Sequence, residues 1–162
     1  MNTLFQPRTA FLLTLLAALG ALGAALAAQF VFGLKPCIMC LWQRLPYALL
    51  IVGAVIALLK PNAAPRLFLI AFLLLFMASA FLAFFHFGIE QHWWSLENGC
   101  KVEALKAKTE AEILAEILST PQAECDKVAW SLFGASITVW NMLFSGAMAL
   151  YLGVVLLRNK NA

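Results

Sequence analysis

Four apolar stretches of about 20 residues each constrain the fold of this chain more than any other feature of its sequence. They cover residues 10–32, 40–59, 67–88 and 135–157. Because an α-helix rises about 1.5 Å per residue, some 20 residues cross a hydrocarbon core of ~30 Å. The sequence therefore predicts an all-α integral membrane protein, a four-transmembrane-helix bundle that forms a single domain over residues 1–162.

Composition supports this fold class. Of the 162 residues, 64% are hydrophobic, whereas a soluble domain is usually about half apolar. The first stretch resembles a secretory signal, since Arg8 precedes it and small residues end it, but a signal core has only about 7–15 residues. We therefore expect an uncleaved helix. Its pairs of small residues four apart, such as Gly20 and Ala24, either let a neighbouring helix approach closely or only reflect an alanine-rich composition.

Basic residues predict which way the helices run. Cytoplasmic segments of membrane proteins carry an excess of lysine and arginine. Both terminal segments and the connection at residues 60–66 contain basic residues and no acidic residue. We therefore expect both termini to be cytoplasmic, which leaves the loops at residues 33–40 and 89–134 outside. Four lysines in the second of these loops argue against this orientation.

All four cysteines fall in these two outer loops. Cys37 and Cys40 lie in the first loop, and Cys100 and Cys125 lie in the second. The outer compartment of a bacterial cell permits disulfides. The resting pattern stays open between two separate pairs and a bond that joins the two loops.

The second outer loop also contains a predicted short amphipathic helix. Thr109 and Glu112 match a capping box, and the apolar residues that follow lie on one helical face. Such a helix could rest on the membrane surface or pack against its own loop. The sequence favours neither arrangement.

Cys37 and Cys40 form a Cys-x-x-Cys pair. A thiolate at a helix start is stabilised by the positive end of the helix and by nearby cations. A stabilised reduced form makes the disulfide more oxidising. Leu41 stands where covalent haem attachment needs histidine. A zinc site would need two further cysteines that are far apart in the sequence, so we expect no metal. A purely structural disulfide remains an alternative.

The length of the second helix places this pair at the membrane boundary. A helix that began at Pro46 would have fourteen residues before Lys60, about 21 Å, which is too short to cross. A start near Cys40 restores about 30 Å. Arg44 then lies one turn after Cys40 on the same face. Its charge could favour a thiolate or an anionic cofactor oxygen, or the side chain could extend to lipid headgroups.

Two histidines lie near the outer end of the third helix. His86 lies inside the apolar stretch and His92 lies in the loop just beyond it. A polar side chain is costly inside an apolar stretch. His86 is therefore the better candidate for a functional role, with a packed or interfacial histidine as the alternative.

Two segments resemble the disulfide bond formation protein B (DsbB) family. Residues 35–44, KPCIMCLWQR, resemble the signature of that family. Residues 125–130, CDKVAW, followed by FGAS at 133–136 and WN at 140–141, are similar to its segment after the last catalytic cysteine. With four helices and two outer cysteine pairs, the resemblance covers nearly the whole chain.

The resemblance implies a quinone-dependent thiol oxidase, a protein-disulfide oxidoreductase of the bacterial inner membrane whose active cysteines face the periplasm. It would reoxidise a soluble, thioredoxin-like dithiol oxidase of the DsbA type and pass the electrons to ubiquinone or menaquinone. In this way it would sustain disulfide bond formation in periplasmic proteins.

The resemblance also implies a role for each cysteine. The reduced partner would attack Cys100, and Cys125 would be the other half of that outer pair. Cys37 would exchange with Cys125, and Cys40 would be the thiolate that faces the quinone.

The remaining implied site residues are Arg44, which would stabilise charge at the quinone, and His86, which falls near a histidine that the family associates with quinone. The chief alternative is a non-catalytic four-helix membrane scaffold whose disulfides staple the outer loops. A transporter is less favoured, because none of the four apolar stretches contains an acidic residue. Nucleic acid is not an expected partner, since no basic run with interleaved aromatic residues occurs.

Overall fold

The computed structural model describes residues 3–94 and 124–159. Its elements are η1 (Thr3–Phe5), α1 (Pro7–Phe30), α2 (Ile38–Trp42), α3 (Arg44–Leu59), α4 (Pro65–Glu90), β1 (Ser131–Leu132), β2 (Ala135–Ser136) and α6 (Ile137–Arg158). The helix α1, the combined α2 and α3, α4 and α6 are each long and apolar enough to cross a membrane. The prediction of a multi-pass, four-helix membrane bundle is confirmed.

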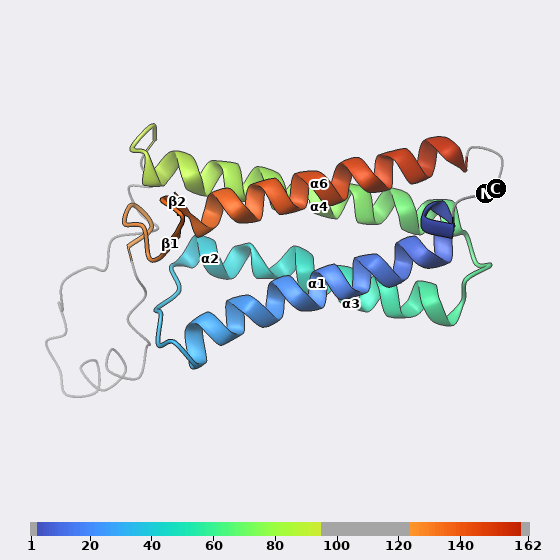
Figure 1. Ribbon diagram of the computed structural model, residues 1–162, viewed down its shortest axis with the longest axis horizontal. Helices are drawn as coiled ribbons and strands as arrows, with labels where there is room; N and C mark the ends of the chain where they lie inside the picture. Colours follow the sequence, from blue (N-terminus) through green and yellow to red (C-terminus); the bar gives the residue numbers. More distant parts are fainter. Residues whose placement is uncertain (1–2, 95–123, 160–162) are drawn as a thin grey trace, which may run out of the picture.

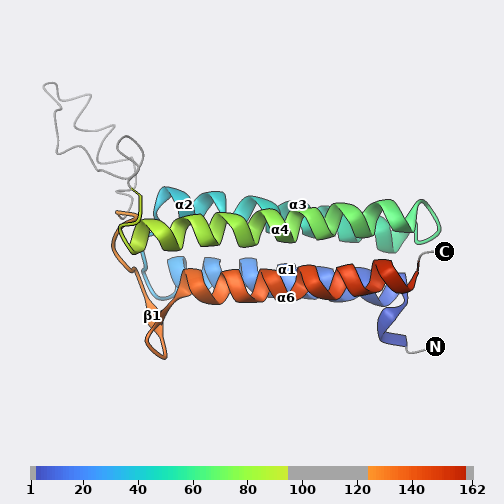
Figure 2. The same cartoon turned by 90° about the horizontal axis from the view of Figure 1, so that it is seen from above.

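The bundle consists of two helix pairs that run side by side (Figures 1 and 2). Helix α4 packs mainly against α6, and α1 packs mainly against α3, while α3 and α4 join the two pairs. Phe11, Leu50, Phe72, Phe76 and Leu152 are almost completely buried in the core between them. Contacts between α1 and α6 are sparse, so the bundle is least tightly packed between these two helices.

The second membrane span is broken between α2 and α3. Cys37 caps the start of α2, and Gln43 separates α2 from α3. Pro46 has no backbone N–H, so the carbonyl of Trp42 receives no helical hydrogen bond from it. A proline in the first turns of a span is a common cause of such a break. As a result, the Gln43 side chain sits at the break, where it is buried.

The two ends of the described chain lie at the same end of the bundle (Figure 1). The Asn159 side-chain amide donates to the carbonyl of Phe5 at 2.8 Å, and the Tyr151 hydroxyl donates to the carbonyl of Leu4 at 2.7 Å. The opposite end carries α2 and the β1–β2 hairpin. Which side of the membrane each end faces stays a prediction. The amphipathic helix predicted after Thr109 lies outside the described residues.

Gly88 on α4 makes room for an aromatic side chain at the cysteine end. A Cβ atom at Gly88 would lie 2.0 Å from Cζ2 of Trp94. The Trp94 ring stacks on Phe85 with 5.3 Å between the ring centroids, and its Nε1 donates to the Phe85 carbonyl at 2.9 Å. The same ring packs against the cluster that contains Cys37 and Cys125.

We expect Gly88→Ala to displace Trp94 and to destabilise the fold. Overpacking of this kind typically costs about 1–3 kcal/mol, which a lower midpoint of thermal unfolding in detergent would report. Gly153→Ala is the matched control, because a Cβ there meets nothing within 4 Å. That control should keep or slightly raise the midpoint, since alanine is the better helix former. Equal midpoints for the two variants would contradict the role given to Gly88.

Candidate active site

Five of the six site residues predicted from the sequence meet at one end of the bundle. Cys37, Cys40 and Arg44 come from the start of the second span, His86 comes from the last turns of α4, and Cys125 comes from the segment before the hairpin. Cys100, the sixth predicted residue, lies outside the described residues. The site therefore combines three separate parts of the chain, which a sequence motif alone does not bring together.

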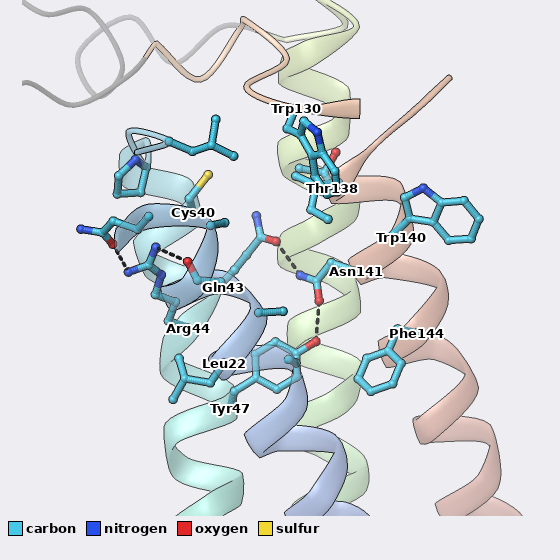
Figure 3. Close-up of a pocket in the computed structure, with 18 of the residues that line it drawn as sticks. Leu22, Cys40, Gln43, Arg44, Tyr47, Trp130, Thr138, Trp140, Asn141 and Phe144 are labelled. Atoms are coloured by element: carbon cyan, nitrogen blue, oxygen red, sulfur yellow. Dashed lines mark hydrogen bonds between the residues drawn. The ribbon is translucent and has the colours of Figure 1, made fainter. Parts of the chain in front are cut away.

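A cavity of about 530 Å³ opens between α1, the α2–α3 break and α6 (Figure 3). Most of its wall is apolar, and α1 contributes mainly alanine and glycine. A Cβ at Gly20 would meet nothing within 4 Å. At Gly20, α1 thus borders open space. No neighbouring helix among the described residues packs closely against it there, contrary to one of the two interpretations of its small residues. The polar members of the wall are Gln29, Lys35, Cys40, Gln43, Arg44, Tyr47, His86, Thr138 and Asn141.

Arg44 is held against α1 at the edge of this cavity. Its Nη1 donates to Oε1 of Gln29 at 2.6 Å, and its Nη2 donates to the carbonyl of Ala25 at 3.5 Å. The Arg44 Nε is buried and has no hydrogen-bond partner among the described residues. A buried donor without an acceptor is costly. The guanidinium is therefore oriented by α1, and its buried Nε–H is left without an acceptor from the part of the chain that the structure describes.

A polar network of side chains, buried except for the part-buried Asn141, runs from the cavity into the bundle. Asn141 Nδ2 donates to Gln43 Oε1 at 2.6 Å, and the Tyr47 hydroxyl donates to Asn141 Oδ1 (Figure 3). Tyr47 Oη lies 2.8 Å from Ser145 Oγ, which lies 3.1 Å from Ser79 Oγ. This polar network was not predicted from the sequence. Its signal is the spacing of Gln43 and Tyr47, and of Asn141 and Ser145, which lie four residues apart and so share helix faces.

Cys37 and Cys40 are free thiols at the start of α2. The Cys37 sulfur accepts a hydrogen bond from the backbone N–H of Cys40 at 3.2 Å, so the thiol caps the helix. The two sulfurs lie 2.9 Å apart. The hydrogen bond to Cys40, together with burial, raises the pKa of the Cys37 thiol above its ordinary value. Cys37 therefore keeps its proton, and Cys40 is the member of the pair that lines the cavity.

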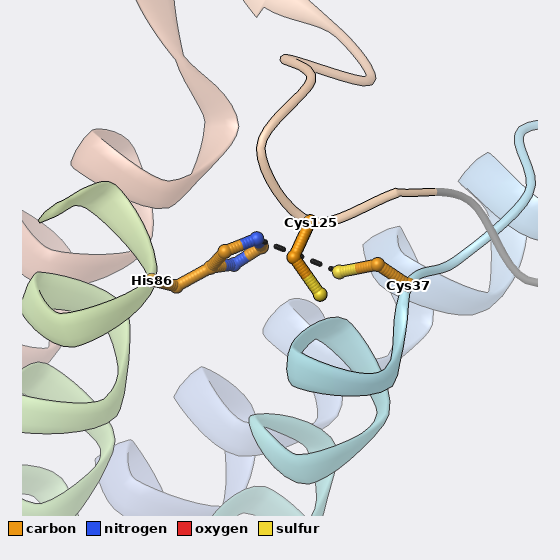
Figure 4. Close-up of side chains that lie close together, drawn as sticks. All are labelled: Cys37, His86 and Cys125. Atoms are coloured by element: carbon orange, nitrogen blue, oxygen red, sulfur yellow. Dashed lines mark hydrogen bonds between the residues drawn. The ribbon is translucent and has the colours of Figure 1, made fainter. Parts of the chain in front are cut away.

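Cys125 lies beside both Cys37 and His86 (Figure 4). It is completely buried and takes part in a disulfide. Its sulfur, the Cys37 sulfur and a ring nitrogen of His86 all lie within 4.8 Å of one another. A metal would need Cys125 as a free thiolate, whereas thiol–disulfide exchange needs a thiol close to a disulfide sulfur. The observed arrangement suits exchange.

His86 lies between Cys37 and Gln43 and so links the cysteines to the polar network. Its Nε2 lies 3.5 Å from the Cys37 sulfur, and its Nδ1 lies 2.8 Å from Nε2 of Gln43. The side chain is buried and also borders the cavity. The sequence singled out His86 because it lies in an apolar stretch, but neither of its partners could be read from that position.

Glu90 is a buried acid that the sequence analysis placed in the outer loop. Helix α4 continues to Glu90, whose carboxylate accepts hydrogen bonds from Ser136 Oγ at 2.6 Å and from Thr138 Oγ1 at 2.7 Å. Ser136 also caps α6 by accepting from the N–H of Thr138. These two hydroxyls offset the loss of water around the carboxylate. Glu90 thus ties the end of α4 to the start of α6.

Comparison with known proteins yields one family and a set of relatives. The family described as "Disulfide bond formation protein DsbB" matches residues 7–155. The chain is 32% identical to a Disulfide bond formation protein B of Actinobacillus pleuropneumoniae, over 93% of this chain and 86% of that protein. It is 31% identical to one from a Polaromonas species, over 94% and 91%. It is 30% identical to Disulfide bond formation protein B 2 of Pseudomonas savastanoi pv. phaseolicola, over 91% and 86%.

Proposed function

Because the chain belongs to the DsbB family of disulfide bond formation proteins, it is a disulfide-forming oxidoreductase, and we propose that it is a quinone-dependent thiol oxidase. It takes electrons from a reduced periplasmic dithiol protein of the DsbA type and delivers them to a membrane quinone. One observation carries this proposal. The dithiol of Cys37 and Cys40 lies between the disulfide-bonded Cys125 on one side and an apolar cavity on the other.

The cavity fits a quinone in size and chemistry. Its volume of about 530 Å³ falls within the roughly 300–1,000 Å³ that is typical of ligand pockets. The apolar wall suits a ring that dissolves in lipid, and the Arg44 side chain in that wall offers a positive charge and guanidinium donors to a quinone oxygen. Cys40 borders the same space. When bound, a quinone supplies the capacity to accept two electrons, and the protein supplies position and charge.

The electron count of the proposed reaction balances. Oxidation of one dithiol to a disulfide releases two electrons and two protons, which reduce one quinone to quinol. The reduced partner first exchanges with an outer disulfide formed by Cys100 and Cys125. Cys125 then exchanges with Cys37, which transfers the reducing equivalents to the Cys37–Cys40 pair. Each exchange breaks one S–S bond and forms another, so only the last step needs the quinone.

Charge placement supports the proposed location in the bacterial inner membrane with the cysteines facing the periplasm. Lys60, Arg66 and Arg158 lie at the end of the bundle opposite the cysteines. Cytoplasmic ends of membrane helices carry such residues. At the cysteine end, the exposed Lys127 is paired with Glu124 at 2.5 Å. The alternative of a stapled scaffold has less support, because Cys37 and Cys40 are free thiols.

The direct test is turnover by the purified full-length protein. Reduced DsbA-type partner plus a short-chain ubiquinone or menaquinone should yield oxidised partner and quinol in equal amounts. Quinone reduction is followed by ultraviolet absorbance, and partner oxidation by thiol trapping. Gly153→Ala should retain the rate, since it lies far from the site. Absence of turnover with both quinones would overturn the proposal.

The two cysteine pairs should be separable by the electron donor. The double variant Cys100→Ser/Cys125→Ser should lose oxidation of the protein partner but should still reduce quinone when a small dithiol such as dithiothreitol is supplied. Both cysteines are replaced so that no freed Cys125 thiol can attack Cys37. Normal oxidation of the partner by this variant would show that the assignment of the outer pair is wrong.

A further inference from the structure

We propose that Gln43 and Asn141 are positioning residues that lock His86 in one tautomer, with its Nε2–H donating to the sulfur of Cys37. This inference deepens the proposed function and rests on it for its catalytic consequence. The tautomer itself can be tested without quinone or partner. The proposal assigns His86 to the thiol that exchanges with Cys125, whereas the sequence had suggested only an association with quinone.

The contact between Gln43 and the imidazole ring of His86 determines which ring nitrogen carries the hydrogen. Gln43 Nε2 lies 2.8 Å from His86 Nδ1. An amide nitrogen carries two hydrogens and can only donate, so Nδ1 accepts. A neutral imidazole carries a single N–H, which must then be on Nε2. That nitrogen lies 3.5 Å from the Cys37 sulfur.

The orientation of the Gln43 amide is set by the next hydrogen bond of the polar network. Gln43 Oε1 accepts from Asn141 Nδ2 at 2.6 Å, which leaves Gln43 Nε2 to face His86. Asn141 is oriented in turn by the Tyr47 hydroxyl, which donates to its Oδ1. A phenol is a good donor and an amide carbonyl is a good acceptor. A hydrogen bond from Tyr47 to Asn141 therefore uses each group in its stronger role.

The contact between Cys37 and the opposite ring nitrogen of His86 leads to the same tautomer without reference to the amides. Cys37 has a single S–H, and the sulfur of Cys40 lies 2.9 Å away, a contact in which either thiol can be the donor. The pKa of Cys37 is raised mainly by its hydrogen bond to Cys40, which favours Cys37 as the donor. With that proton directed to Cys40, Cys37 has none left to give to His86. The contact between His86 and Cys37 therefore needs the hydrogen on the ring, which again places it on Nε2.

The consequence concerns charge on the Cys37 sulfur during exchange. When the Cys100 thiolate attacks Cys125 in a Cys37–Cys125 disulfide, a Cys100–Cys125 bond forms and the Cys37–Cys125 bond breaks. The electron pair of the broken bond moves to the Cys37 sulfur. A donor N–H at that sulfur stabilises the developing thiolate. His86 keeps its proton throughout, and no proton has to pass through the Gln43 amide.

The test reads the tautomer directly in the full-length, quinone-free, reduced protein. Nitrogen-15 labelling of histidine distinguishes protonated from unprotonated ring nitrogens by NMR, and a His92→Gln variant assigns the His86 signals. We expect a protonated Nε2 and an unprotonated Nδ1. A protonated Nδ1 in the unmodified protein would overturn the proposal. It would mean that His86 donates to Gln43 and that the hydrogen bonds through Gln43 and Asn141 run in the reverse direction.

Two substitutions should invert the tautomer by different routes. Gln43→Glu replaces the donor with a carboxylate, which can only accept from an Nδ1–H. Asn141→Asp changes a residue that has no hydrogen bond to the His86 ring, but the new carboxylate cannot donate to Gln43 Oε1 as the Asn141 amide does. Gln43 should then turn its Nε2 to residue 141 and its carbonyl to His86. Ser79 lies at the end of the polar network that is farthest from His86. Ser79→Ala is therefore the matched control and should leave the His86 signals unchanged.

The redox equilibrium of the Cys37–Cys40 pair distinguishes a positioning role of Gln43 and Asn141 from a purely structural one. With the Cys37–Cys40 couple equilibrated against glutathione, loss of the N–H donor should lower the reduced-to-oxidised ratio by roughly threefold to tenfold in Gln43→Glu and Asn141→Asp. The control should keep the ratio of the unmodified chain. If Asn141→Asp leaves both the tautomer and the ratio unchanged, the positioning role is wrong. Failure of quinone turnover would instead count against the proposed function and would leave these measurements intact.

Discussion

Replacing Cys40 with serine should abolish electron transfer to quinone and should leave Cys37 bonded to Cys125. Without Cys40 the pair can no longer form the disulfide that delivers two electrons. A serine hydroxyl can donate to the Cys37 sulfur, whereas the hydrogen bond to Cys40 holds the Cys37 proton and is the main cause of the raised pKa of Cys37. The pKa of Cys37 should therefore fall towards its ordinary value, although burial keeps it partly raised. A larger thiolate fraction then attacks the Cys125 sulfur, which lies within 4.8 Å.

Two measurements check this result. Quinone reduction should drop to background, and peptide mapping under non-reducing conditions should recover a Cys37–Cys125 linkage. The rate at which the linkage forms should increase with pH until the pKa of Cys37 is passed, because the thiolate is the attacking species. The double variant Cys37→Ser/Cys40→Ser is the control and should show no new linkage. Persistence of the original Cys125 disulfide in Cys40→Ser at alkaline pH would contradict the proposed contact.

Replacing Arg44 with methionine should raise the KM for quinone and spare exchange with the partner. Methionine keeps much of the side-chain length but removes the positive charge and the guanidinium donors from the cavity wall. A hydrogen bond to a charged group contributes about 1.5–3 kcal/mol. We therefore expect KM for quinone to rise roughly tenfold to a hundredfold. Steady-state kinetics with varied quinone, at saturating partner, measure this effect.

Gln29→Leu is the control for the Arg44 experiment. It removes the partner of Arg44 Nη1 but leaves the charge, so its effect on KM should be smaller. The half-reaction with reduced partner alone should proceed normally in both variants, as thiol trapping would show. Equal losses in the quinone and partner half-reactions of Arg44→Met would mean that Arg44 serves the fold and has no particular role towards quinone.

The elements of this fold that depend on local pattern were predictable. Hydrocarbon thickness sets how many apolar residues a spanning helix needs, so four stretches of that length were sufficient to predict four spans. The spacing of Cys37, Cys40 and Arg44 places them within a few residues of one helix start, and the structure has them there. The break at Gln43 also follows from a local cause, the missing N–H of Pro46.

Helix neighbours were not predictable in the same way. Small residues on α1, including Gly20 and Ala24, suit either a close helix crossing or an open wall. In the bundle α1 packs mainly on α3, and α6 packs mainly on α4. The small residues consequently line the cavity. No periodicity within one stretch reports which face of another helix will lie opposite.

The four apolar stretches and the Cys37–Cys40 motif thus specify a membrane bundle with a dithiol at a helix end, since length and spacing act within one segment of chain. Tertiary packing supplies what surrounds that dithiol. It brings Cys125 and His86 to Cys37, and it joins Gln43 to Asn141 across two helices. The two residues of each contact are separated by between 49 and 98 positions in the sequence. They exist only once the helices have chosen their partners, because each buried polar group then has to find its hydrogen bond among the faces that meet.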